Sequence, residues 1–168
     1  MANKRTTLYL SGKLYWAKVF GNPRPNYDGD AREWTFEFEP DEDSVEQLEE
    51  LGLDDRLRDR SDKKGYEGRG KFIILKRKEF KVDGEKNEHI RVVDAANQNW
   101  DSNKLLGNGT TADVKVTVVD YGPRKKEGIY PVAIRVLDLV EYQQDEFAPL
   151  SDDDPRKKAA KAKRQGTD

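Results

Sequence analysis

The chain has 168 residues, of which 38% are charged and 35% hydrophobic, with a formal net charge of −2. This length corresponds to about one domain and is enough to bury a core. The absence of cysteine excludes disulfides, thiolate nucleophiles and cysteine-ligated zinc. No run of about 18 apolar residues offers a membrane span, and the N-terminus lacks the apolar segment of a secretion signal.

The charge is unevenly distributed along the chain. Residues 40–63 include ten acidic and four basic residues, whereas the segment from Ser151 onwards has six basic and four acidic ones. The rest of the chain is therefore mildly basic. A sequence pI of about 5.7 argues weakly against nucleic-acid binding, but this segregation weakens the objection.

The first 40 residues predict two strands separated by a loop. Thr7 to Phe20 reads as a long strand with Gly12 as its bulge or bend, and Gly21 to Asp30 is dense in turn residues. From Trp34 to Glu39, aromatic residues alternate with polar ones. This alternation is typical of a half-buried strand, and it puts the three aromatic rings in the core.

An acidic helical insertion is expected at about 41–62. Ser44 fits the N-cap position, with Gln47 three residues later at capping-box spacing. Gly52 fits the position just after a helix end, and a second short helical turn follows it. The simplest interpretation is a helical cap over one end of a barrel.

The middle of the chain predicts a hairpin. Lys71 to Phe80 starts apolar and becomes basic, and Asp83-Gly84 is a strong hairpin signal. We therefore expect His89 to Val93 to be the return strand.

The last part begins with a tight turn at Gly107-Asn108-Gly109. The turn opens into two alternating segments joined by a basic loop, and the second segment runs from Tyr130 to Tyr142. After residue 143 the pattern stops, and residues 144–168 predict a flexible, disordered and charged tail.

These elements predict a mainly β fold, a small closed or partly open barrel of five or six strands with a helical insertion, covering residues 1–143. Periodicity alone does not separate an OB-fold from other small barrels or from a sandwich.

Enzymatic chemistry has little support in the sequence. His89 is the only histidine, and the Gly107-Asn108-Gly109 turn lacks the spacing of a dinucleotide fingerprint. Carboxylates could be assembled into the site of a metal-dependent nuclease, but charged residues on strand surfaces are usually just solvated. We therefore expect neither catalysis nor a bound metal or cofactor. The carboxylates in question are Asp28, Asp30, Glu37, Glu39 and Glu79.

Binding of single-stranded nucleic acid has better support, because it needs cations beside exposed aromatic rings. Tyr15, which lies between Lys13 and Lys18, is the better stacking candidate. Trp16 shares the parity of the core leucines unless Gly12 resets the register. Trp100 lies in a polar loop and is either a lid over the core or a platform for a base.

Five blocks of the sequence together resemble the single-stranded DNA-binding proteins of podovirus-type phages. The order of the blocks is specific, although each one alone is weak. They are KLYWAKVF (13–20), FIILKRKE (72–79), VVDAANQNWD (92–101), LLGNGTTADVKVTVVDY (105–121) and VAIRVLDLVEY (132–142).

The resemblance implies that this barrel is an OB-fold-like five-stranded antiparallel barrel, and that the protein coats single strands during phage DNA replication and recombination. It also implies a place in the cytoplasm of the infected host, replication proteins such as a polymerase or helicase as partners, and scope for a homo-oligomer. Proteins of this kind often end in an acidic tail. Here Asp152-Asp153-Asp154 is followed by a basic run, and we hypothesise that this run adds phosphate contacts instead.

The predicted interface combines stacking rings with phosphate-neutralising cations. Two alternatives stay open, a metal-dependent nuclease and a phage adaptor or structural protein that binds no DNA. The predicted binding residues are Lys13, Tyr15, Trp16, Lys18, Lys71, Phe72, Lys76, Lys78, Arg91, Trp100, Arg124, Lys125 and Lys126.

Overall fold

The computed structural model describes residues 4–26, 28–64, 66–81 and 83–141. Its helical elements are α1 (Glu42–Glu50) and the 3₁₀ helix η1 (Asp54–Arg56). Its strands are β1 (Lys4–Lys18), β2 (Arg24–Pro25), β3 (Arg32–Pro40), β4 (Ile73–Lys78), β5 (Arg91–Val93), β6 (Thr110–Asp120) and β7 (Gly128–Asp138).

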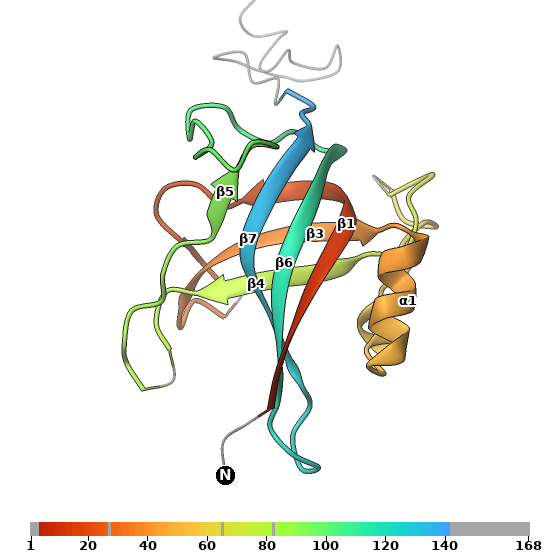
Figure 1. Ribbon diagram of the computed structural model, residues 1–168, viewed down its shortest axis with the longest axis vertical. Helices are drawn as coiled ribbons and strands as arrows, with labels where there is room; N and C mark the ends of the chain where they lie inside the picture. The colour runs from red at the N-terminus through yellow and green to blue at the C-terminus, as the bar shows by residue number, and fades with distance from the viewer. Residues whose placement is uncertain (1–3, 27, 65, 82, 142–168) are drawn as a thin grey trace, which may run out of the picture.

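All seven strands belong to one curled sheet, in the order β2-β3-β1-β6-β7-β5, with β4 paired to β3. The long strand β1 makes the curl possible, because it pairs with β6 along its first eleven residues and with β3 along its second half. The sheet bends back on itself around this strand (Figure 1). Arg77 links the two ends of the curl, since its Nη1 atom on β4 donates to the carbonyl oxygen of Pro131 on β7 at 3.2 Å.

The core is built from the inward parity of these strands. Trp34, Phe36 and Phe38 of β3 are each at most 3% exposed, as their alternation predicted. The inward residues of β1 and β6, such as Leu14 and Val114, meet them from the neighbouring strands. The residues of β1, β3 and β4 that face away from the core include many polar and charged side chains.

The helix forms where the acidic insertion was expected, beside β1 and β3 (Figure 1). Its N-cap is Asp41 rather than Ser44, because the Asp41 carboxylate accepts from the backbone N–H of Ser44 at 2.9 Å. The Ser44 hydroxyl is buried and accepts instead from the N–H of Ser11, which ties α1 to β1. Gly52 adopts a φ of 70° just after the helix end, the conformation that glycine tolerates best.

Two further local predictions were wrong in part. Gly12 is not a bulge, since its pairing is continuous with both neighbours, and a Cβ there would lie 2.1 Å from the carbonyl oxygen of Glu39. The register shift occurs later, between Tyr15 and Lys18.

The turn at 83–84 does form, since Phe80 and Lys86 make an antiparallel bridge across it, but the expected return strand at 89–93 does not pair with β4. This segment contains β5, which pairs in parallel with β7.

The mainly β class with one helical insertion is confirmed, although the sheet has seven strands and one parallel pair. The predicted tail at 144–168, including its basic run, lies outside the described residues.

Candidate nucleic-acid interface

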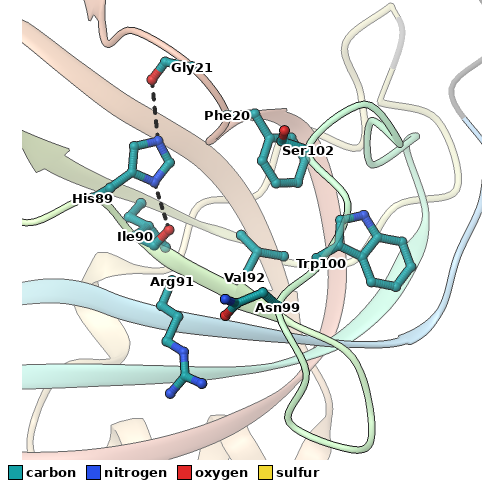
Figure 2. Close-up of a pocket in the computed structure, with 9 residues that line it drawn as sticks. All are labelled: Phe20, Gly21, His89, Ile90, Arg91, Val92, Asn99, Trp100 and Ser102. Atoms are coloured by element: carbon teal, nitrogen blue, oxygen red, sulfur yellow. Dashed lines mark hydrogen bonds between the residues drawn. The ribbon is translucent and has the colours of Figure 1, made fainter.

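A hollow of about 400 Å³ lies between the end of β1, strand β5 and the loop that follows β5. Phe20 and Trp100 contribute aromatic rings to its lining, and Arg91 and Asn99 contribute polar groups (Figure 2). A concave surface with rings and a few polar groups is the usual form of a ligand site. Arg91 and Trp100 were predicted from the sequence, and the structure brings them together.

Trp100 is held in a fixed orientation. Its backbone N–H donates to the Val92 carbonyl oxygen and its indole Nε1 donates to the Lys104 carbonyl oxygen, both at 2.9 Å. The turn before it is closed by Asp94, whose carboxylate accepts from the N–H groups of Ala96 and Gln98. The half-buried ring therefore has little conformational entropy left to lose when a ligand stacks on it.

His89 connects two walls of the hollow. Its Nδ1 lies 2.8 Å from the carbonyl oxygen of Ile90, and its Nε2 lies 3.2 Å from that of Gly21 (Figure 2). The loop after β1 is thereby anchored to the segment that leads into β5. The sequence offered no signal for this connection.

A row of cations lies next to the hollow on the outer face of β1, β3 and β4. Lys18 and Lys76 both pair with Thr35, one from each side, and Lys78 pairs with Glu33 two residues further along β3. All three lysines are exposed. Lys18 lies two residues before Phe20, which lines the hollow.

Arg77, between two of these lysines in sequence, has a different role. Its Nε donates to the carbonyl oxygen of Glu88 at 2.6 Å, in addition to its bond to Pro131. Burial lowers the pKa of Arg77, and the carboxylate of Glu88 opposes this effect. Arg77 therefore acts as a link within the barrel.

Trp16 is exposed to 51%, and its exposure results from the register shift. Its φ of 52° is rare for a residue with a side chain, and its backbone N–H donates to the Oδ1 atom of Asn108 at 2.8 Å. The Gly107-Asn108-Gly109 turn thus does more than lead into β6, because it also holds the backbone of Trp16 in place.

Tyr15 and Phe72 do not present free rings. Phe72 is fully buried, so its burial does not agree with the predicted role as a stacking platform. Its ring is stacked on Tyr66 at 5.6 Å, and the guanidinium carbon of Arg69 lies 3.5 Å from the ring centroid of Tyr15. Burial raises the pKa of Tyr15; Glu39 adds to this effect, and Arg69 opposes it. Lys13 and Lys71 are exposed at this end of the face.

The basic loop at 124–126 is separate from the hollow. It lies at the far end of the arm formed by β6 and β7, well away from β5 (Figure 1). The ammonium group of Lys125 lies 4.5 Å from the ring centroid of Tyr121, whose hydroxyl is 2.6 Å from that of Tyr130. Arg124, Lys125 and Lys126 are exposed and therefore form a second basic surface.

Sequence reasoning missed three rings near the site. Phe20 and His89 line the hollow, and Phe80 is 52% exposed beside Arg32 and Lys78 in a second hollow of about 310 Å³. Phe20 has the parity of core leucines, and Phe80 ends a strand pattern, so neither stood out as a surface ring.

Two kinds of feature are absent from the described part of the chain. No group of three or more His, Cys, Asp or Glu residues within it could hold a metal ion. None of its helices has the length and apolar character needed to cross a membrane.

No protein-family model matches the sequence, and no curated protein matches it. Solved structures do match. gp2.5, a single-stranded DNA binding protein encoded by bacteriophage T7, matches at a TM-score of 0.51 and 13% identity, over 86% of this chain and 92% of that one.

The single-stranded DNA-binding protein of bacteriophage Enc34 matches in two structures, both at a TM-score of 0.54 and 10% identity. The complex with ssDNA covers 88% of this chain and 89% of that one. The C-terminal truncation covers 80% and 85%.

These matches span most of both chains. They confirm the OB-like class that the sequence predicted. The protein therefore has the fold of the phage single-stranded DNA-binding proteins, the group that its sequence blocks resemble.

Proposed function

We propose that this protein binds and coats single-stranded DNA without strong base preference. The observation that carries the proposal is the hollow, which is lined by the fixed ring of Trp100, the ring of Phe20 and the basic residue Arg91. Proteins that bind single strands combine a positive groove with aromatic rings, and each stacked base contributes about 1–3 kcal/mol.

The cation row gives the strand a path to this hollow. Lys18, Lys76 and Lys78 are exposed on one face, and the chain reaches Phe20 two residues after Lys18, the last residue of β1. A strand that crosses this face would place phosphates beside the lysines and bases against the rings. Neutralised phosphates release counterions, so the affinity should fall steeply as salt rises.

The likeness in fold supports a biological setting for this activity. One of the matching phage proteins was solved in complex with ssDNA. By analogy of fold, this protein would act without catalysis during phage DNA replication and recombination in the cytoplasm of an infected bacterium. A phage polymerase or helicase would be a partner, and the strand would be coated by single copies or by a homo-oligomer.

Tryptophan fluorescence provides the direct test. Trp16 is 51% exposed and Trp100 lines the hollow, so oligo-dT should quench the emission of the protein. We expect saturable quenching at low salt, with a clearly weaker apparent affinity at high salt. Oligo-dA and oligo-dC should bind within a few-fold of oligo-dT.

The same samples separate the two alternatives. Cleavage of labelled oligonucleotide after addition of magnesium, abolished by replacing one carboxylate, would identify a metal-dependent nuclease. Fluorescence that oligonucleotides leave unchanged at every salt concentration would contradict DNA binding and favour an adaptor or structural protein.

A further inference from the structure

The ring of Tyr15 is covered by another side chain of the same protein. The guanidinium carbon of Arg69 lies 3.5 Å from the centroid of this ring, and 4.9 Å from the centroids of Tyr66 and Phe72. Tyr15 belongs to the outer face of β1, in register with Glu37 of β3. A planar guanidinium stacks on aromatic rings much as a base does, so Arg69 occupies the surface that a base would use.

Arg69 belongs to a covering segment, Tyr66–Lys71, which two carboxylates of β3 hold against the sheet. The Nη1 atom of Arg69 lies 3.1 Å from Oε1 of Glu37, and the hydroxyl of Tyr66 donates to Oε2 of the same residue at 3.2 Å. The backbone N–H of Gly70 donates to Oε1 of Glu39 at 2.6 Å. The stack of Tyr66 on Phe72 also holds the segment, so a competing ligand needs to displace only the Arg69 guanidinium.

The remaining edge of the Arg69 guanidinium has no acceptor. The Arg69 side chain is only 9% exposed, and its buried Nε and Nη2 atoms make no hydrogen bond with any part of the chain that the structure describes. A buried charged donor without an acceptor is costly, which lowers the stability of the covered state. Nε and Nη2 form the edge of a guanidinium that binds a phosphate or carboxylate through two parallel hydrogen bonds.

We infer that Arg69 covers a base-stacking site on Tyr15 in the free protein and that a bound strand takes its place. A base then stacks on the ring of Tyr15, while the Nε and Nη2 edge of the released Arg69 binds a phosphate of the same strand. This inference rests on the proposed function and adds a second stacking site to it, at the opposite end of the cation row from Phe20.

The exchange replaces each contact that is lost. A base replaces Arg69 in the stack on Tyr15. The Nε and Nη2 edge of Arg69 gains a phosphate acceptor, and water can hydrate the carboxylate of Glu37. Only the fraction of molecules in which Arg69 has left Tyr15 can bind a base at this site, so the apparent affinity falls as that fraction falls. The covering segment therefore adjusts binding without altering the hollow.

A double-mutant cycle between Tyr15→Ala and Arg69→Lys tests the exchange. Lysine keeps the positive charge that attracts DNA. It lacks the planar guanidinium that covers the ring of Tyr15 and the paired N–H donors that bind a phosphate. In the wild-type background, Tyr15→Ala removes both the stacking surface and the contact that holds Arg69 over it. We therefore expect less than about a twofold loss of oligo-dT affinity there, against a loss of about fivefold or more in the Arg69→Lys background.

Tyr66→Phe gives a second test that leaves the charge unchanged. It removes the hydrogen bond to Glu37 and should loosen the covering segment, so Tyr15→Ala should again cost more affinity in this background than in the wild type. Circular dichroism and urea unfolding of each variant show whether the fold is intact.

Equal effects of Tyr15→Ala in all three backgrounds, with wild-type binding intact, would show that Arg69 is a permanent part of the surface and would overturn this inference alone. Failure of the wild-type protein to bind oligo-dT would instead overturn the proposed function.

Discussion

The indole of Trp34 and the imidazole of His89 meet at one acceptor, the carbonyl oxygen of Gly21. Trp34 donates to it from Nε1 at 3.0 Å, and Nε2 of His89 lies 3.2 Å from it. The two rings contact each other edge to face, with their centroids 4.6 Å apart. A core residue of β3 thus sets the position of the loop that forms one wall of the hollow.

Trp34→Phe should destabilise the protein, because it removes a buried indole that is 3% exposed together with its hydrogen bond to Gly21. We expect the free energy of unfolding to fall by about 1–3 kcal/mol. Urea denaturation followed by circular dichroism measures this change. Trp100→Phe is the matched control, since its half-buried indole N–H bonds to a carbonyl at the surface and should cost less. A larger loss for the control would contradict this account of the wall.

Trp100→Ala should weaken DNA binding more than it weakens the fold. Loss of one stacking platform should cost about 1–3 kcal/mol of binding free energy, which is roughly a 5- to 150-fold increase in Kd. Anisotropy of a labelled oligo-dT measures the affinity. Trp100→Phe should retain most of it, because a ring remains in the hollow. Unchanged affinity in a folded Trp100→Ala variant would show that the hollow does not hold a base.

Two charge-matched double variants distinguish the cation row from the arm. Lys76→Gln/Lys78→Gln and Lys125→Gln/Lys126→Gln each remove two positive charges, so general attraction to DNA changes equally. We expect the first pair to reduce the slope of log K against log salt by about 1.4, since each phosphate contact on a single strand contributes about 0.7. The second pair should change the slope less, because its loop lies far from the hollow (Figure 1). A larger change in slope for Lys125→Gln/Lys126→Gln would indicate that DNA binds along the arm rather than along the cation row.

Alkaline pH should destabilise the arm through Tyr130. Burial, the largest cause, and the hydrogen bond to Tyr121 together raise the pKa of Tyr130 to about 12. Because the folded pKa lies above the ordinary value of about 10, the fold favours the neutral phenol. The resulting stabilisation is complete below about pH 10 and is lost as the pH rises through about 12.

Urea unfolding of the wild type and of Tyr130→Phe across this range measures the effect. Lysines titrate here as well, so the difference between the two proteins isolates the phenol. If the difference in unfolding free energy between the wild type and Tyr130→Phe stays constant with pH, folding does not raise the pKa of Tyr130.

The alternation of Trp34, Phe36 and Phe38 was sufficient to predict a strand and a core, because side chains two apart on a strand always share a face. Gly52 marked the helix end for an equally local reason, since a positive φ favours glycine. By contrast, the partner of β5 could not be read from the hairpin signal at 83–84, because strand pairing depends on where distant segments meet.

The sequence by itself determined the inventory of this protein: the strand periods, the acidic helix, and a supply of rings and cations suited to a single strand. Only the tertiary structure decided which rings are available. The register shift after Tyr15 turns Trp16 outward, and the covering segment places Arg69 over Tyr15 and buries Phe72. The hollow around Trp100 likewise joins residues 20–21 to residues 89–102, which are remote in sequence. Exposure of a side chain depends on what the rest of the chain packs against it, and no local pattern contains that information.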